Sequence, residues 1–216
     1  MIRRPKRAPL PVLLVVLLGL SACTADGSAA PSIPPDSQTQ PAMGTWSPAQ
    51  SGLIAATGDP VVMPSTPGFS SGVLYVSRVY VDQTRAAHTA QLAVITAGEG
   101  ISHAFAGVYD PASGRLLAST ADLSSALSTV GALQAPLTPE LAAQPRNKEL
   151  WLVLLIGGMT KSPTVIGGRE YGSNLGLSGD YRLWISAGST FTALPAAIPQ
   201  LKVPAHGSIP FLAIGP

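Results

Sequence analysis

Short apolar segments whose side chains alternate with a period of two recur along this chain, and glycine and proline are frequent between them. Residues 72–81 (GVLYVSRVYV) show the alternation clearly. One side of that segment carries Tyr75, Ser77 and Val79, and the other carries Leu74, Val76, Arg78 and Tyr80. The chain also holds 22 glycines and 21 prolines, which favour turns and interrupt long helices. The sequence therefore predicts short strands, because period two is the strand signal.

A hairpin is predicted at residues 107–120 (GVYDPASGRLLAST). Pro111 supplies a fixed φ and Gly114 a positive φ between two apolar arms. Further strands are expected at 91–96, 103–109, 115–120, 149–158, 180–186 and 208–215, with a short helical turn at 122–127. The segment 149–158 (ELWLVLLIGG) is apolar at almost every position, which is typical of a central strand, and Trp151 is expected in the core.

This pattern of short strands and turns predicts an all-β fold. We expect a two-sheet antiparallel β-sandwich, of which a jelly roll is one form. The predicted domain spans residues 46–216, which is enough chain to bury a core.

The N-terminus predicts export. Residues 1–22 have a basic start, an apolar core and a small-residue end, as a secretory signal peptide does. Leu20-Ser21-Ala22-Cys23 resembles the lipobox of bacterial lipoproteins, in which the cysteine is acylated, and Cys23 is the only cysteine. An ordinary cleaved signal with a cysteine beside the cut is the alternative. Residues 23–45 are rich in Ser, Pro and Ala and are predicted to be a disordered tether. The protein is therefore expected on the extracytoplasmic face of the cell membrane, bound to it through lipid on Cys23.

Charge excludes one class of partner. Charged residues make up only 11% of the chain, and four of its 13 basic residues precede the apolar run of the signal. Nine basic residues then remain against 11 acidic ones, without a basic cluster. We expect no nucleic-acid binding, because that needs Lys and Arg to neutralise phosphates.

Catalytic and metal-binding motifs are weak. Residues 68–72 (GFSSG) match the G-x-S-x-G pattern of hydrolases, with Ser70 as nucleophile, but they precede a predicted strand instead of a helix. Asp110 or Asp180 with His206 would complete a triad in chain order. The histidines at 88, 103 and 206 lack metal-site spacing and are interpreted as structural. We expect no catalytic residue, no metal and no cofactor.

Aromatic and polar residues near the C-terminal end suggest a ligand face. Arg182 and Trp184 share one side of a predicted strand, where they could stack on a sugar ring or contact a partner protein. The alternative is that Trp184 fills the sandwich. The polar loop 167–179 adds Arg169, Tyr171 and Asn174 as candidate binding residues.

Several segments also follow a recognisable order: 46–60, 72–81, 105–124, 132–141, 149–158 and 192–201. In this order the segments resemble those of a β-sandwich domain found in bacteriophage minor tail proteins and in related secreted proteins of high-GC Gram-positive bacteria. In that group a segment like GLYD-x-x-G-x-LLA-x-(S/T)-AD precedes one like YWVALL-x-x-G-T-T-P-T. The matching residues here are Gly107, Tyr109, Asp110, Gly114, Leu116, Leu117, Ala118, Thr120, Ala121 and Asp122, then Trp151, Gly157, Thr160, Pro163 and Thr164. The resemblance implies a shared scaffold and no catalytic residue, while the lipobox is a departure from it, since a virion component needs none.

The expected function is a membrane-tethered, non-catalytic binding or structural module. Its ligand would be cell-wall glycan or an envelope or phage protein. One alternative is a phage minor tail protein acting in the virion, and a second is an unrecognised hydrolase.

Overall fold

The computed structural model describes residues 46–66, 68–168, 183–185, 190–198 and 209–216; for Trp184 and Ile185 it describes the backbone only. Apart from the short helices η1 (Pro48–Ser51) and α1 (Ser124–Leu127), the regular elements in these ranges are strands. They are β1 (Ala55–Ala56), β2 (Val73–Tyr80), β3 (Ala87–Thr96), β4 (His103–Tyr109), β5 (Leu116–Thr120), β6 (Gly131–Leu141), β7 (Glu149–Gly157), β8 (Thr164–Val165), β9 (Leu183–Ile185) and β10 (Ala213–Gly215). The predicted all-β class is confirmed.

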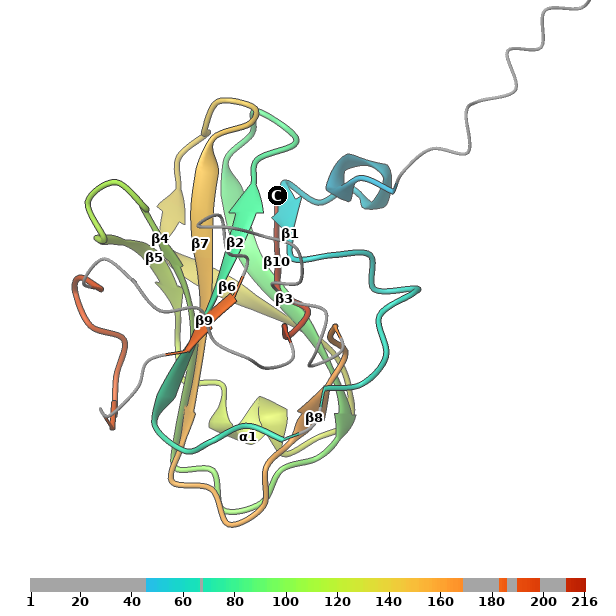
Figure 1. Ribbon diagram of the computed structural model, residues 1–216, viewed down its shortest axis with the longest axis vertical. Coiled ribbons are helices and arrows are strands. Elements are labelled where there is room, and N and C mark those ends of the chain that lie inside the picture. The colour runs from blue at the N-terminus through green and yellow to red at the C-terminus, as the bar shows by residue number, and fades with distance from the viewer. Residues whose placement is uncertain (1–45, 67, 169–182, 186–189, 199–208) are drawn as a thin grey trace, which may run out of the picture. The chain divides into compact units, whose positions relative to one another are not determined.

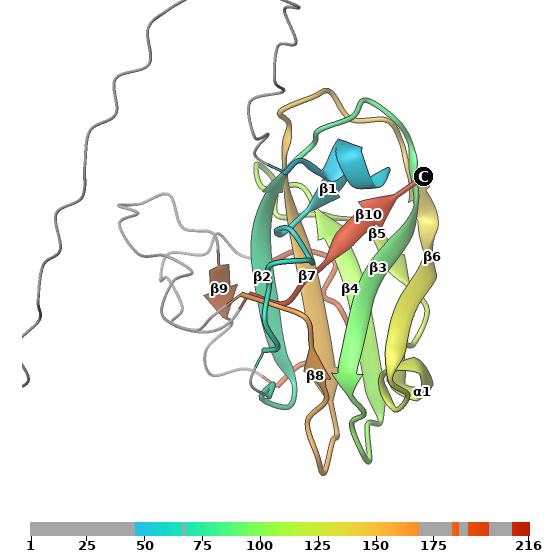
Figure 2. The ribbon, with the colours of Figure 1, turned by 90° about the vertical axis from the view of Figure 1, so that its right-hand side faces the viewer.

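The strands form one antiparallel sheet in the order β1-β10-β3-β6-β5-β4-β7-β2-β9, with β8 paired to β3 (Figure 1). β6 belongs to both layers, because it pairs with β3 through Gly131–Pro136 and with β5 through Leu137 and Thr138. Across the open end, the Asp82 N–H donates to the Ile54 carbonyl at 2.8 Å, beside β1. The sheet thus folds over on itself into a nearly closed sandwich (Figure 2).

One hydrophobic core lies between the two layers. β7 contributes Leu150, Leu152, Leu154 and Ile156 to it, and β3 contributes Leu92 and Val94 from the opposite layer. Burying a leucine or isoleucine side chain stabilises the fold by about 1.5–3 kcal/mol. The alternation predicted for 72–81 is confirmed, since Tyr75 and Val79 join this core while Leu74 and Val76 face the other way.

A second apolar layer covers the outer face of the β5-β4-β7-β2 sheet. Trp151, Val153 and Leu155 of β7 pack there, so that β7 is buried on both faces. A segment of irregular backbone, residues 190–198, contributes Phe191, Leu194 and Ile198 to this layer. We call it the covering segment.

The sequence missed β6. Its segment GALQAPLTPEL contains Pro136 and Pro139, which favour turns in a local interpretation. The strand tolerates them because its pairing with β3 is irregular there: Ala87 pairs with Leu141 and Thr89 with Pro136, which leaves extra residues on β6. The predicted hairpin is correct, with Gly114 at φ 70° and the Asp110 N–H donating to the Arg115 carbonyl at 2.9 Å.

Two buried hydroxyls provide a test of the core. Ser77 Oγ has no hydrogen-bond partner among the described residues, whereas Thr120 Oγ1 accepts the buried Ala106 N–H at 3.1 Å. We expect Ser77→Ala to leave the free energy of unfolding unchanged or to raise it by up to about 1 kcal/mol, because no hydrogen bond is lost. Thr120→Val should lower it by about 1–3 kcal/mol, because an N–H is left unsatisfied. Urea unfolding monitored by circular dichroism measures both, and equal losses for the two variants would show that the Thr120 hydrogen bond adds no stability.

Candidate functional site

An open cavity of about 480 Å³ lies at the end of the sandwich where the β4–β5 hairpin turns. Its lining comes from three separate parts of the chain: the hairpin loop, β7 and the covering segment. The residues are Pro111, Ala112, Ser113, Gly114, Trp151, Ala197 and Ile198. The volume falls within the range of small-ligand sites, about 300–1,000 Å³.

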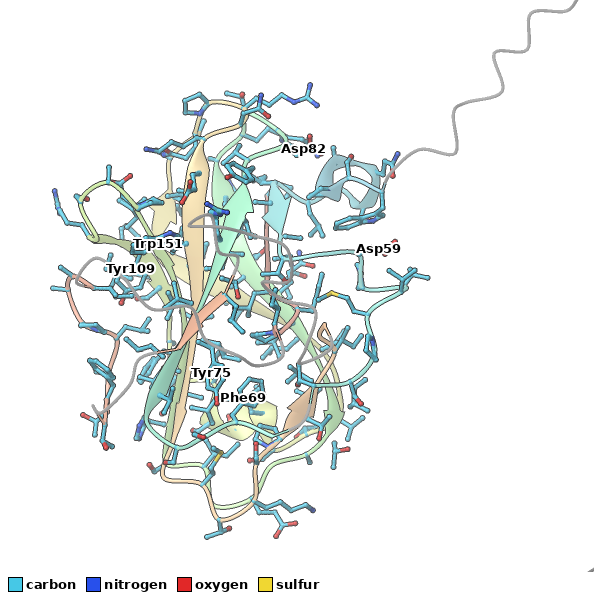
Figure 3. All side chains as sticks on the ribbon, in the orientation of Figure 1. Asp59, Phe69, Tyr75, Asp82, Tyr109 and Trp151 are labelled. Carbon is cyan, nitrogen blue, oxygen red and sulfur yellow. The ribbon has the colours of Figure 1, made fainter. Side chains whose placement is uncertain are left out.

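Trp151 forms the aromatic part of this lining and is only 5% exposed. Antiparallel pairing places it opposite Arg78 on β2 and opposite Tyr109 on β4. Because directly paired residues share a face of the sheet, the three side chains form one row across the outer face. Figure 3 shows Trp151 and Tyr109 beside the hairpin.

The hairpin wall is held by Asp110. Its carboxylate accepts the Ser113 hydroxyl at 2.7 Å, the Ser113 N–H at 3.1 Å and the Lys148 ammonium at 3.0 Å. The Ser113 hydroxyl, and then Lys148, lower the pKa of Asp110 below its ordinary value. Asp110 therefore stays ionised near neutral pH, and its charge is balanced by Lys148.

The opposite wall is the covering segment, which is attached to the hairpin by main-chain hydrogen bonds. The Leu116 N–H donates to the Ala196 carbonyl at 3.0 Å, and the Ile198 N–H donates to the Gly114 carbonyl at 2.8 Å. The buried Tyr109 hydroxyl donates to the Pro195 carbonyl at 2.8 Å. Burial raises the pKa of Tyr109 far above its usual value, so this donor remains protonated.

An aromatic and cationic surface adjoins the row. Tyr80 lies two residues beyond Arg78 on the same face of β2 and is 50% exposed. The Arg78 guanidinium carbon lies 5.9 Å from the centroid of the Tyr80 ring, within range of a cation–π interaction. Arginine and tyrosine are enriched at recognition surfaces, and these two extend the exposed area near Trp151.

The cavity is suited to binding. None of its described lining residues carries an ionisable side chain, and the one lining hydroxyl among them, that of Ser113, donates to the Asp110 carboxylate at 2.7 Å. It offers an indole, a proline ring, small apolar side chains, a seryl hydroxyl and backbone amides. Such a lining matches a small, uncharged ligand with both polar and apolar faces.

Most of the predicted site residues lie outside the described ranges: Cys23, Arg169, Tyr171, Asn174 and Arg182. The backbone of Trp184 is described, and it pairs with Val76 of β2 in strand β9. Trp151 is buried as expected, although it packs on the outer face and not between the layers.

The residues considered for chemistry fall in different places. Ser70 precedes strand β2 and its N–H donates to the Tyr75 hydroxyl at 2.7 Å, so it does not occupy the strand-to-helix turn that a nucleophile elbow requires. Asp180 and His206 lie outside the described residues. His88 contacts Glu140 at 3.0 Å. Within the described ranges no group of three metal-binding side chains occurs, and no helix there is long and apolar enough to cross a membrane.

Sequence reasoning missed the cavity itself. Its walls are 111–114, 151 and 197–198, which only the folded sheet brings together. The available signals were the Asp-Pro-x-Ser-Gly turn and the segment TALPAAIPQL at 192–201, whose prolines and apolar residues suit an extended covering chain.

Comparison of the sequence with models of known protein families gives no match, and comparison with curated proteins gives none either. The site is therefore interpreted from its own geometry.

Gly114 tests how the cavity wall is built. It has φ 70°, and a Cβ there would collide with the Ile198 carbonyl oxygen. Gly52 has φ 72° but nothing within 4 Å of a Cβ, so it provides a matched control for backbone strain alone. We expect Gly52→Ala to cost about 1–2 kcal/mol of stability. Gly114→Ala should cost about 1–3 kcal/mol more, because the covering segment must move. Equal losses in urea unfolding would show that the segment does not depend on this contact.

Proposed function

We propose that this protein is a lipid-anchored, extracytoplasmic envelope lipoprotein whose β-sandwich binds an uncharged stretch of cell-envelope glycan in the cavity beside Trp151. The observation that supports the binding role is the open cavity of about 480 Å³, whose described lining residues include an indole and carry no ionisable side chain. The observation that carries the location is the lipobox-like sequence ending at Cys23.

The lining supports a sugar ligand on chemical grounds. A saccharide unit has an apolar ring face and hydroxyl groups at its edges, which complement an indole and a proline ring next to amide and hydroxyl groups. Next to the hairpin loop, Asp110 and Lys148 form an ion pair at 3.0 Å. A charged ligand would find no partner among the described lining residues.

The resemblance to phage minor tail proteins is compatible with this proposal. It rests on turn and core residues, such as Asp110, Gly114 and Trp151, which build the scaffold of the cavity. A structural role in the virion is the alternative function. Acylation of Cys23 distinguishes the lipid-anchored protein from a virion protein.

A cavity-blocking substitution tests the binding role. Ala197 is exposed at the cavity wall, whereas Ala132 is exposed on β6 and does not line the cavity. With the full-length chain in detergent, we expect Ala197→Trp to weaken binding of soluble cell-wall glycan fragments at least tenfold, because the indole fills the site. Ala132→Trp should bind like the unmodified protein. Isothermal titration calorimetry measures both affinities.

Binding that is equal in the two variants would place the ligand elsewhere. Retention of envelope proteins but not of glycan fragments would favour a protein ligand over the proposed glycan.

The anchor is tested at Cys23. We expect the protein expressed in a bacterial host to incorporate radiolabelled fatty acid and to partition into the membrane, because acylation follows the lipobox. Cys23→Ser should abolish both incorporation and partitioning, while leaving glycan binding unchanged. Mass spectrometry of the mature N-terminus provides the second measurement. An unacylated Cys23 or an intact Met1 would contradict the anchor and favour the virion alternative.

A further inference from the structure

A second group of polar side chains lies at the other end of β4 and β7 from the cavity. Ser102 and His103 are at the start of β4, whereas the hairpin that lines the cavity follows its last residue, Tyr109. Seven residues of strand separate the two places by about 20 Å. The residues at this end therefore belong to a separate site.

Hydrogen-bond contacts connect Ser102, His103 and the Phe191 carbonyl at this site. His103 Nε2 lies 3.1 Å from the Phe191 carbonyl, which can only accept, so Nε2 carries a proton. In the neutral imidazole the other nitrogen, Nδ1, is then an acceptor. Ser102 Oγ lies 2.8 Å from Nδ1 and donates its proton to it. The same hydroxyl can instead donate to the Gly157 carbonyl, at the longer distance of 3.3 Å.

The end of β7 leaves space for this pair. A Cβ at Gly157 would collide with the ring of His103, and a Cβ at Gly158 would collide with Ser102 Oγ. Gly158 also has φ 67°, a conformation that other residues rarely adopt. Two consecutive glycines thus accommodate one hydroxyl and one imidazole.

Asp122 provides a negative charge near the imidazole. Its Oδ1 accepts the Ser124 N–H at 2.8 Å and the Ala104 N–H at 3.0 Å. Burial alone would raise the pKa of Asp122, but these hydrogen bonds and, more weakly, the charge of His103 lower it below its ordinary value. Asp122 is therefore an ionised carboxylate in the electrostatic neighbourhood of His103.

Ser102 is exposed, so a substrate can reach its hydroxyl. A second hydroxyl lies close by, because the Gly158 N–H donates to Ser71 Oγ at 2.9 Å. Among the described residues no acceptor takes the Ser71 proton, which leaves it available for the oxygen of an incoming carbonyl. A nucleophile, a base oriented by a third group and a nearby donor are the parts of acyl-transfer chemistry.

We propose that Ser102 is an activated nucleophile that accepts acyl groups from small, uncharged carboxylic esters, with His103 as its general base. Ser102 Oγ forms a bond to the carbonyl carbon while its proton passes to His103 Nδ1. The tetrahedral intermediate then breaks its bond to the ester oxygen, and the leaving alcohol takes the proton from His103. Water repeats the same steps on the acyl-serine, which releases the acid and restores the hydroxyl.

This chemistry goes beyond the proposed binding function and does not depend on it. Covalent labelling reports on Ser102, whereas glycan affinity reports on the cavity about 20 Å away. Failure of one experiment therefore leaves the other unaffected.

The test uses the full-length chain in detergent with a fluorophosphonate probe and with p-nitrophenyl acetate. Mass spectrometry of peptides locates the modified serine. We expect Ser102 to be labelled about 100-fold faster than Ser125, an exposed serine on α1, because a general base contributes about 10²–10⁴ in rate. Ser102→Ala should abolish labelling at this position and the turnover of the ester, while Ser125→Ala should change neither.

The base is tested with a pair of histidine variants. His103→Gln should slow labelling of Ser102 about 100-fold, whereas His88→Gln, at an exposed histidine paired with Glu140, should leave it unchanged. Asp122→Asn should lower the labelling rate, because the negative charge near His103 is lost.

Labelling of Ser102 no faster than that of Ser125 would overturn the proposal. A labelling rate that is equal in the His103 and His88 variants would overturn the role of His103 as base.

Discussion

Burial of β7 on both faces is the constraint from which the rest of the structure follows. One face of β7 packs against the opposite layer of the sandwich through Leu150, Leu152, Leu154 and Ile156. The other face is buried under a separate apolar layer that contacts Trp151, Val153 and Leu155. A strand with apolar side chains on both faces cannot lie at the surface of a two-layer protein without exposing one set to water. The covering segment meets that need with Phe191, Leu194 and Ile198. This segment crosses the sheet as irregular chain and leaves an opening beside the hairpin. The opening is lined in part by Trp151 and is the candidate binding cavity.

Backbone hydrogen bonds, more than side chains, attach the covering segment to the sheet. Gly72, Gly114 and Leu116 each exchange a main-chain hydrogen bond with it, and Tyr109 and His103 add one side-chain bond each. The glycine at 114 lets the two backbones approach so closely that a Cβ would collide with the Ile198 carbonyl. The same segment therefore contributes to both candidate sites: Ala197 and Ile198 line the cavity, and the Phe191 carbonyl orients His103.

The two ends of β4 carry different chemistry. At the hairpin end Asp110 and Lys148 form an ion pair, and the cavity-lining residues that the structure describes carry no ionisable side chain. At the other end Ser102, His103 and Asp122 gather hydrogen-bonding and charged groups around an exposed hydroxyl. Binding of a neutral ligand needs the first arrangement, and proton transfer needs the second. The length of β4 separates the two places by about 20 Å.

The sequence by itself determined the class of fold and much of its local structure, because alternation and turn residues act over short distances. The strands at 72–81 and 103–109 and the Gly114 hairpin were all predictable in this way. β6 was not, since Pro136 and Pro139 are acceptable only where its pairing with β3 is interrupted. Nor were the sites. The sequence interpretation of His103 as structural could not anticipate its contact with the carbonyl of Phe191, which is 88 positions away. Likewise, no local sequence signal connects Trp151 with Ala197. Those contacts depend on strand order and register, which arise from the packing of distant segments around β7, and only the tertiary structure decided them.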